Sequence, residues 1–306
     1  MIEIKEHVPL ASLTTFEIGG NARYFAEAKN ENDIQDAMSW AKEHGKPYII
    51  LAGGSNVLVP DEGIEGLVIN IVSQKFDISE TGVHAEAGCN LLQLIRSAAD
   101  AGLGGWEKLG GIPGTIGGAV RGNAGAFGPE IKDFVTWVRA LDVSTGEIRE
   151  FSNPECEFSY RMSHFKKHPE LIIFDIHLQL QKMNSAESHH HIEETIQDRE
   201  RRHIQNVRAA GSFFMNPVVP DPIREMFEKE KQVKSREGRV PAGWLIEKAG
   251  MKGARVGGAE ASVQHPNYLV NADEATESEV KELAEQIRKA VFEKFGVTLT
   301  EEAVVW

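Results

Sequence analysis

The chain has 306 residues, 41% of them hydrophobic and 26% charged, so it is long enough for two domains with separate cores. Its formal net charge of −13 argues against general nucleic-acid binding, which needs a basic surface. No apolar run approaches the ~20 residues of a membrane span. The N-terminal sequence MIEIKEHVPL lacks a basic segment followed by an apolar one, so we expect no signal peptide.

The first half of the chain alternates strand-like and helix-like segments. Residues 22–28 and 48–52 predict strands. Between them, apolar side chains recur at helical spacing over residues 34–41, after Asn30 or Asn32 as a candidate helix cap.

The same alternation continues toward the middle of the chain. Asn90 precedes a second helical pattern that ends at Gly102. Residues 134–143 and 147–151 flank a Ser-Thr-Gly turn and predict a hairpin, and residues 171–180 predict a further strand.

A polar segment over residues 181–190 interrupts this pattern. We therefore place a domain boundary near residue 183, which divides the chain into domains 1–183 and 184–306. The composition of the two parts predicts an α+β nucleotide-binding domain followed by a smaller α/β domain.

Three helices are predicted in the second domain, over residues 192–205, 241–250 and 276–295. The second has Pro near its start and Gly at its end. The third begins with Thr276 and Glu279, which form a capping box.

Two glycine-rich loops are the most informative feature of the chain. The sequence AGGSNVLV at 52–59 directly follows a predicted strand, and residues 102–128 contain eleven of the 29 glycines. Such loops direct several backbone N–H groups at one point and bind anions, and a following helix start adds to the effect. Two of them indicate a large phosphorylated ligand such as a dinucleotide. The alternative is a set of tight turns in a β-rich domain.

Neither loop is a Walker loop or a standard Rossmann fingerprint. In GGIPGTIGGA, we expect the side chains of Ile112, Pro113 and Ile116 to pack on the flat face of an aromatic cofactor. The loop with Ser55 and Asn56 would close on the diphosphate from another side, and turn capping is the alternative for these two residues.

Three further segments carry reactive residue types. Arg161 in YRMS has a planar fork suited to a carboxylate or phosphate, the alternative being a surface arginine. Ser212 precedes two phenylalanines. Its hydroxyl can lie in a narrow pocket from which water is excluded, the alternative being a turn before a strand. Glu301 and Glu302 precede an apolar terminal strand, so one carboxyl can be partly buried with a raised pKa, the alternative being two exposed carboxylates.

Metal and serine-hydrolase motifs are absent from the sequence, which has neither HExxH nor GxSxG. We interpret His189, His190 and His191 as the exposed start of a helix and expect no metal site. Cys89 and Cys156 are isolated, which fits a reducing cytoplasm, and we expect both to be buried.

Seven motifs in the same order resemble the UDP-N-acetylenolpyruvoylglucosamine reductase family in its shorter form, from Thr15 to Glu302. They are TTFEIGGNARYF, AGGSNVLV, GGIPGTIGGAVRGNAGAFG, YRMS, AGSFFMNP, PAGWLIEKAG and FGVTLTEE. The resemblance implies an FAD-binding domain of the vanillyl-alcohol-oxidase/PCMH type, with two subdomains, and a C-terminal α/β domain that binds the substrate.

The resemblance also implies an activity, namely a cytoplasmic reductase of peptidoglycan precursor synthesis. FAD, held without a covalent bond, would take hydride from NADPH and reduce UDP-N-acetylenolpyruvoylglucosamine to UDP-N-acetylmuramate. The partners expected are therefore this small sugar nucleotide and NADPH, with no nucleic acid and no membrane, and we expect a monomer.

The family's residue roles fall on matching positions of this chain. Arg161 and Glu302 would bind the substrate carboxylate and stabilise its enolate form, and Ser212 would donate a proton as general acid. The cofactor-binding residues implied are Gly53, Gly54, Ser55, Asn56, Ile112, Pro113, Gly114, Thr115, Gly117, Gly118 and Asn123. The substrate-binding residues implied are Tyr160, Asn216 and His265.

The chain departs from the family pattern at three places. Met215 stands where a lysine is usual, Phe127 replaces the tyrosine of GAYG, and Arg121-Gly122 replaces an apolar or Asn-containing pair. These departures bear on substrate affinity more than on the type of reaction.

Two other functions remain open from the sequence: an FAD-dependent oxidase of related fold, and a nucleotide-binding module without catalytic activity. The presence of Arg161, Ser212 and Glu302 together argues against the oxidase.

Overall fold

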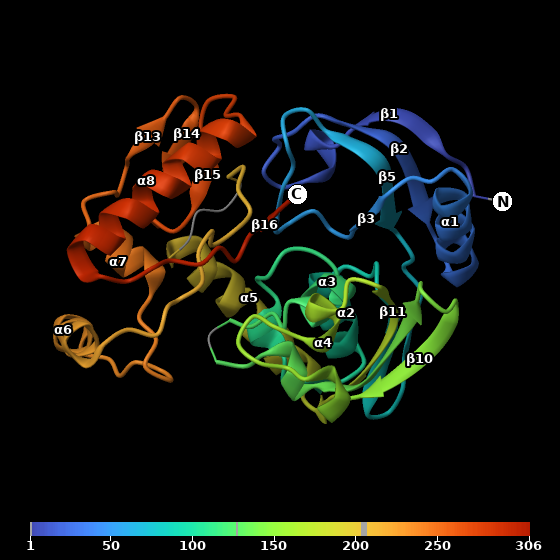
Figure 1. The fold of residues 1–306 in the computed structure, drawn as a ribbon. Coiled ribbons are helices and arrows are strands. Elements are labelled where there is room, and N and C mark those ends of the chain that lie inside the picture. The colour runs from blue at the N-terminus through green and yellow to red at the C-terminus, as the bar shows by residue number, and fades with distance from the viewer. Residues whose placement is uncertain (1, 127, 203–206) are drawn as a thin grey trace. The chain divides into compact units, whose positions relative to one another are not determined.

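The computed structural model describes residues 2–126, 128–202 and 207–306 (Figure 1). The chain forms two compact units that are interleaved in sequence. The first unit is made of residues 1–8, 22–54 and 64–201, and the second of 9–21, 55–63 and 202–306. The expected boundary near residue 183 lies inside the first unit. Whether the chain divides functionally at that residue stays a prediction.

One sheet of the first unit has four strands in the order β1-β2-β5-β3, and both β2 and β3 run parallel to β5. The strands are β1 (Lys5–Pro9), β2 (Asn21–Ala28), β5 (Ile64–Ile71) and β3 (Tyr48–Leu51). Helix α1 (Glu31–Glu43) follows β2, and the Asn30 side chain caps it by accepting the N–H of Asp33. The predicted strands and the helix between them are therefore confirmed.

The second sheet of this unit is antiparallel, in the order β10-β9-β11-β7-β6. Its strands are β6 (Phe76–Ile78), β7 (Gly82–Glu86), β9 (Val135–Asp142), β10 (Glu147–Ser152) and β11 (Leu171–Gln179). The predicted hairpin is β9 with β10, and the predicted strand over 171–180 is β11.

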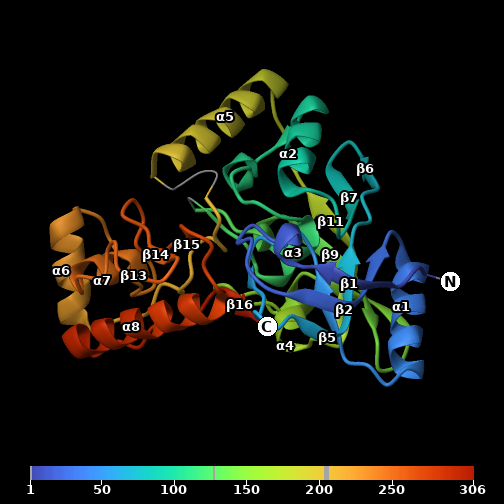
Figure 2. The same cartoon turned by 90° about the horizontal axis from the view of Figure 1, so that it is seen from above.

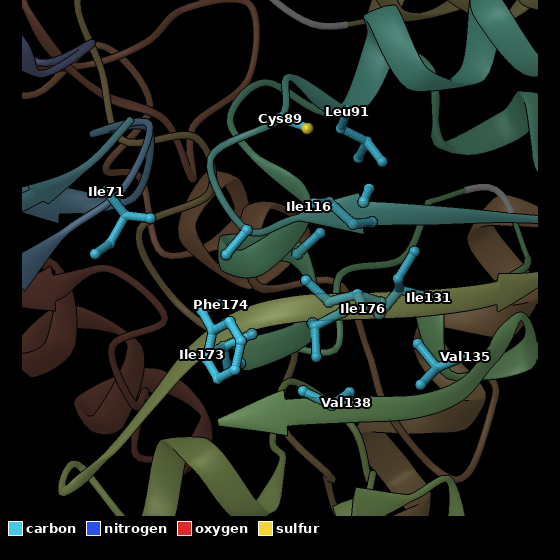
Figure 3. Packing of buried hydrophobic residues seen from close by; sticks show 14 of the residues in the cluster. Ile71, Cys89, Leu91, Ile116, Ile131, Val135, Val138, Ile173, Phe174 and Ile176 are labelled. Atoms are coloured by element: carbon cyan, nitrogen blue, oxygen red, sulfur yellow. The ribbon is translucent and has the colours of Figure 1, made fainter. Parts of the chain in front are cut away.

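A helical layer packs on this sheet through a continuous apolar core. The predicted helix after Asn90 is α2 (Leu91–Asp100), and α3 (Ile116–Arg121) contacts β7 and β11. Ile116 and Ile176 are fully buried in this core, as Figure 3 shows. Shorter elements complete the unit: α4 (His164–Lys167), the pair β8 (Leu103–Gly104) and β12 (Gln181–Lys182), and the 3-10 helices Glu107–Leu109, Ile131–Asp133 and Pro154–Cys156.

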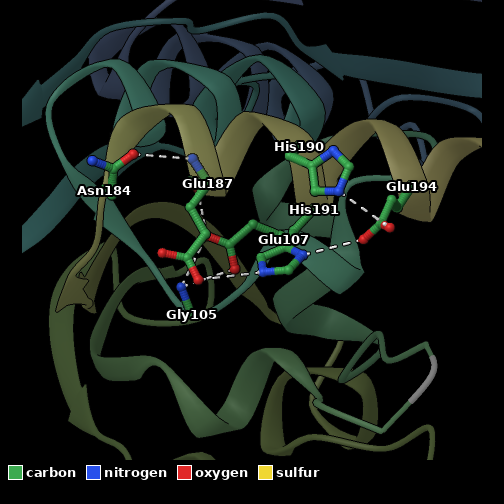
Figure 4. A network of polar contacts seen from close by, with 8 residues as sticks. Gly105, Glu107, Asn184, Glu187, His190, His191 and Glu194 are labelled. Atoms are coloured by element: carbon green, nitrogen blue, oxygen red, sulfur yellow. Dashed lines mark hydrogen bonds and ion pairs between the residues drawn. The ribbon is translucent and has the colours of Figure 1, made fainter.

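Helix α5 (Ser185–Arg202) begins earlier than the predicted start at residue 192, and the predicted end at Gln205 lies outside the described residues. The side chain of Asn184 accepts the N–H of Glu187 at the first turn (Figure 4). Ser188 donates to the buried carboxylate of Glu107 at 2.5 Å. Polar contacts rather than an apolar stripe therefore hold the start of this helix, which is why apolar periodicity did not locate it.

The three histidines consequently lie within α5 and not at its start, so that interpretation is wrong. Each lies beside a carboxylate. His189 pairs with Asp100 at 2.7 Å. Both His190 and His191 pair with Glu194 at 3.3 Å, as Figure 4 shows.

The second unit packs three helices and short strands around its own core. Its elements are the 3-10 helix Ala11–Leu13, β4 (Val57–Leu58), α6 (Asp221–Lys231), α7 (Ala242–Lys248), β13 (Arg255–Val256), β14 (Ala259–Ala261), β15 (Leu269–Asn271), α8 (Glu277–Phe295) and β16 (Val304–Val305). Figure 2 shows α8 as the long helix of this unit. Its capping box of Thr276 and Glu279 is present, and Gly296 ends it at φ +65°, as predicted.

Helix α6 was not predicted. Of its residues only Phe227 is buried, against Trp244, so its sequence carries many charges and a weak apolar signal.

Both thiols are buried, as predicted: Cys89 is 3% exposed and Cys156 is fully covered. Burial raises the pKa of Cys89 to about 11 and that of Cys156 to about 12, from 9.0. A rise of two units lowers the thiolate fraction at neutral pH about a hundredfold.

We predict that a disulfide reagent such as DTNB labels neither cysteine in the native protein at pH 7.5 and labels both in denaturant. Rapid labelling of the native protein would contradict the burial of these thiols.

Candidate functional site

The two glycine-rich loops meet backbone to backbone within the first unit. A Cβ atom placed on Gly53 would lie 2.8 Å from the Cα of Gly114 and 3.2 Å from the N of Thr115. No side chain fits at that distance, so glycine at position 53 is required for the two loops to approach. Gly54 and Gly114 also have positive φ angles of 61° and 110°, which glycine adopts without strain.

The backbone N–H groups at this meeting point are not used inside the unit. Among the described residues, none accepts a hydrogen bond from the N–H of Gly53, Gly54, Gly114 or Thr115. Backbone donors in folded proteins are almost always paired, so four such groups in two touching loops form a donor set for an anionic ligand. This is the chemistry that the diphosphate of a dinucleotide requires.

The start of α3 contributes less than the sequence predicted. Ile116 donates its N–H to Cys89, and Gly117 donates to Ala87, both at 2.9 Å. Gly118 donates to the Thr115 side chain at 3.3 Å. Gly117 is needed because a Cβ there would lie 2.7 Å from that of Ala87.

The side chains beside the loop differ in their exposure. Ile116 is fully buried in the core, so the expectation that it packs on a cofactor is wrong. Ile112 is half-buried and Pro113 is exposed, so their surfaces are accessible to a ligand.

A clasp of three hydrogen bonds joins the end of this loop to the segment that carries Arg161. Ser163 Oγ donates to the carbonyl of Arg121 at 2.7 Å, and Asn123 Nδ2 donates to the carbonyl of Ser159 at 2.9 Å. Arg161 Nη2 donates to the carbonyl of Gly125 at 3.0 Å. The side chain of Asn123 is fully buried and bonded inside the protein, so its contribution to a ligand site is to hold the clasp in place.

The backbone of Arg161 is itself unusual, with φ at +56°. This left-handed conformation is uncommon for a residue with a side chain and persists where the surrounding structure enforces it. The guanidinium lies over the ring of Tyr160, 5.2 Å from its centre. Arg161 and Tyr160 are therefore held in a defined arrangement on the first unit.

The second unit brings Ser212 and Glu302 onto adjacent segments of the chain, which are joined by backbone hydrogen bonds. The N–H of Glu302 donates to the carbonyl of Phe213 at 2.8 Å, and Phe214 forms an antiparallel bridge with Glu301. Ser212 and Glu302 are both half-buried. Of the two adjacent carboxylates, Glu301 is the one that forms an ion pair with Arg288, at 2.8 Å, and this gives it a structural role.

Asn56 supports the terminal segment from the other side. Its Nδ2 donates to the carbonyl of Glu302 at 3.1 Å, and its own carbonyl accepts the N–H of Val304 at 3.0 Å. Ser55, which precedes it, is the first residue after Gly54 to belong to the second unit.

The other two predicted substrate-binding residues lie close to this strand pair. The Asn216 side chain accepts the N–H of Ala242 at 2.9 Å and so caps the start of α7. His265 stands at a turn where its carbonyl accepts the N–H of Tyr268, and the two rings are 4.8 Å apart.

Asn267 was missed from the sequence, although it organises the strand that follows Ser212. Its side chain accepts the N–H of Phe214 at 2.9 Å and donates to the carbonyl of the same residue at 2.8 Å, while its own carbonyl accepts the N–H of Phe213. It is 2% exposed. The available signal was a polar residue at the edge of the apolar segment 268–270, where a buried amide is costly unless it is bonded.

Phe127 lies outside the described residues, and Met215 is half-buried with its N–H bonded to the carbonyl of Thr300. In the described part of the chain, no three His, Cys, Asp or Glu side chains are grouped so as to hold a metal ion. None of the described helices is both long and apolar enough to cross a membrane.

Comparison with known proteins matches both units of the chain. Residues 22–152 match the model of an FAD binding domain, and residues 202–306 match that of the C-terminal domain of UDP-N-acetylenolpyruvoylglucosamine reductase. The reductase of Solibacter usitatus is 36% identical over 98% of this chain and 96% of its own length, and that of Pseudomonas aeruginosa is 34% identical over 98% of both. The crystal structure of the Thermus caldophilus reductase is 31% identical and aligns over 100% of both chains with a TM-score of 0.79.

The touching glycine loops and these matches define an FAD-dependent oxidoreductase, and the predicted α+β fold class is confirmed. More specifically, the chain belongs to the UDP-N-acetylenolpyruvoylglucosamine reductase family. FAD, the cofactor expected from the sequence, is confirmed by the same matches.

The role of Asn267 gives a stability prediction. Asn267→Ala leaves the N–H and carbonyl of the buried Phe214 without partners, and each such loss costs roughly 1–3 kcal/mol. We expect a clear decrease in the midpoint of urea unfolding. The control is Gln264→Ala in the same loop, whose side chain is exposed. If both variants unfold at the midpoint of the parent, Asn267 does not hold this strand.

Proposed function

We propose that this chain reduces UDP-N-acetylenolpyruvoylglucosamine to UDP-N-acetylmuramate with NADPH as hydride donor, in peptidoglycan precursor synthesis. The observation that carries the proposal is the direct backbone hydrogen bonding between the segments of Ser212 and Glu302. This pairing brings the backbones of a hydroxyl-bearing and a carboxylate-bearing residue onto adjacent segments, which suits the protonation of a carbanionic carbon beside a carboxylate. The relatives named as this reductase support the same activity.

The residues present fit FAD. The donor set of Gly53, Gly54, Gly114 and Thr115 suits its diphosphate, and the accessible surfaces of Ile112 and Pro113 suit an apolar ring. The shape of the second loop depends on Gly117, Gly118 and Asn123. The first loop closes on the diphosphate with Ser55 and Asn56. Bound FAD supplies the hydride transfer from NADPH to the enolpyruvyl group.

FAD is held without a covalent bond. The nearest sequence candidates for a covalent link are Cys89 and His84. Cys89 is buried, with its thiol donating to the carbonyl of Lys75 at 3.3 Å, and His84 pairs with Asp175 at 3.3 Å. The thiol of Cys89 is therefore engaged inside the protein, and the imidazole of His84 lies beside a carboxylate.

Each catalytic side chain has a distinct task. Arg161 binds the substrate carboxylate, because its planar fork matches two carboxylate oxygens. Glu302 stabilises the charge distribution of the enolate form, and Ser212 donates the proton that the carbon requires after it has received hydride. Tyr160, Asn216 and His265 contact the sugar nucleotide.

The enzyme works in the cytoplasm as a monomer, and its activity serves cell-wall growth and division.

The half-reactions separate these roles. Reduction of bound FAD by NADPH needs no proton from Ser212, whereas oxidation by the enolpyruvyl sugar nucleotide does. We expect Ser212→Ala to keep the first rate near that of the parent and to slow the second about 10²–10⁴-fold. Glu302→Gln should show the same asymmetry, and Glu301→Gln is the matched control with both rates retained. Stopped-flow absorbance of the flavin measures each phase.

Two outcomes would overturn the proposal. If the parent consumes NADPH no faster when the enolpyruvyl sugar nucleotide is added, the substrate is wrong. If Ser212→Ala loses the first phase as severely as the second, this residue serves cofactor binding or folding instead.

A further inference from the structure

Arg121 is a half-buried cation to which the proposed reaction assigns no role. It is the last residue of α3, and burial lowers the pKa of its guanidinium below the usual value. Within the described residues, its guanidinium makes no hydrogen bond and no ion pair. Its backbone carbonyl accepts a hydrogen bond from Ser163 Oγ.

This lack of a counter-charge distinguishes Arg121 from two other half-buried arginines of the chain. Arg139 is paired with Asp175 at 2.9 Å, and Arg288 with Glu301 at 2.8 Å. The chain carries 46 acidic residues against 33 basic ones, so carboxylates are plentiful. Taking a cation partly out of water is unfavourable unless an anion accompanies it. A ligand can provide that anion where the protein does not.

The position of Arg121 indicates what kind of ligand this is. It lies six positions after Thr115 of the donor set, at the other end of α3. The clasp of three hydrogen bonds ties its segment to that of Arg161. Arg121 therefore stands between the loop proposed for the cofactor phosphates and the arginine proposed for the substrate carboxylate.

We propose that Arg121 is an anion-binding residue whose guanidinium binds a phosphate group of a bound nucleotide. An arginine fork makes two parallel hydrogen bonds to phosphate oxygens, and a desolvated one binds them more strongly than an exposed one. The chemistry is shared by three molecules of the proposed reaction: FAD, NADPH and the uridine diphosphate part of the substrate. The inference rests on the proposed function for this choice of ligands but not for the presence of the anion site.

Binding measurements on Arg121→Met and Arg121→Lys test the proposal without any turnover. The probes are FAD added to protein stripped of flavin, and NADP⁺ and UDP added to the flavin-loaded protein, each by calorimetry. We expect Arg121→Met to bind one of the three at least tenfold more weakly than the parent, and Arg121→Lys to lie between them, since lysine keeps the charge and loses the fork. The probe that weakens identifies the source of the phosphate.

The matched control is Arg149→Met, an exposed arginine on β10 whose nearest carboxylate is 3.8 Å away. It should bind all three probes as the parent does. If Arg121→Met and Arg121→Lys bind every probe within twofold of Arg149→Met, Arg121 is not an anion-binding residue. A protein that binds UDP and NADP⁺ through Arg121 but fails to consume NADPH with the enolpyruvyl substrate would contradict the proposed function and leave this inference standing.

Discussion

The close approach of Gly53 and Gly114 is the constraint on which the candidate cofactor site depends. A Cβ atom on Gly53 would lie 2.8 Å from the Cα of Gly114, so position 53 cannot carry a side chain on the side that faces the second loop. This contact places the end of β3 against the turn before α3, two segments some sixty residues apart in sequence. The four backbone N–H groups at this contact have no acceptor in the described structure. Glycine at position 53 allows the two backbones to approach closely because it has no Cβ atom.

The rest of the site is held by polar clasps that involve few residues. In the first unit, Asn123 and Ser163 tie the loop end to the segment of Arg161. In the second unit, Asn267 and Asn56 hold the segments that carry Ser212 and Glu302. These bonds fix the backbone of each segment, and one further bond of the first clasp holds the guanidinium of Arg161 itself, so the residues proposed for chemistry occupy defined positions. Preorganisation of this kind is what electrostatic stabilisation requires.

The sequence predicted most regular elements because their signals are local. The capping box of Thr276 and Glu279, the Asn30 cap and the hairpin of β9 and β10 all appear where expected. The errors arose where distant contacts decide the structure. Ser188 bonds to Glu107, 81 residues away, and extends α5 beyond its apolar pattern. Ile116 follows the glycine loop in sequence, yet its side chain lies in the core. The N–H of Gly117 donates to the carbonyl of Ala87 and is not available to a ligand. The interleaving of the two units is a property of tertiary packing that no local pattern encodes.

The unpaired N–H groups of the two touching loops are proposed to bind the diphosphate of FAD. Amide hydrogen exchange, followed by mass spectrometry on flavin-free and flavin-loaded protein, measures those groups directly. The account predicts that FAD slows exchange most at peptides containing residues 53–54 and 114–115, where the unpaired amides lie. If FAD binds and exchange at both loops is unchanged, the phosphates are held elsewhere and the account is wrong.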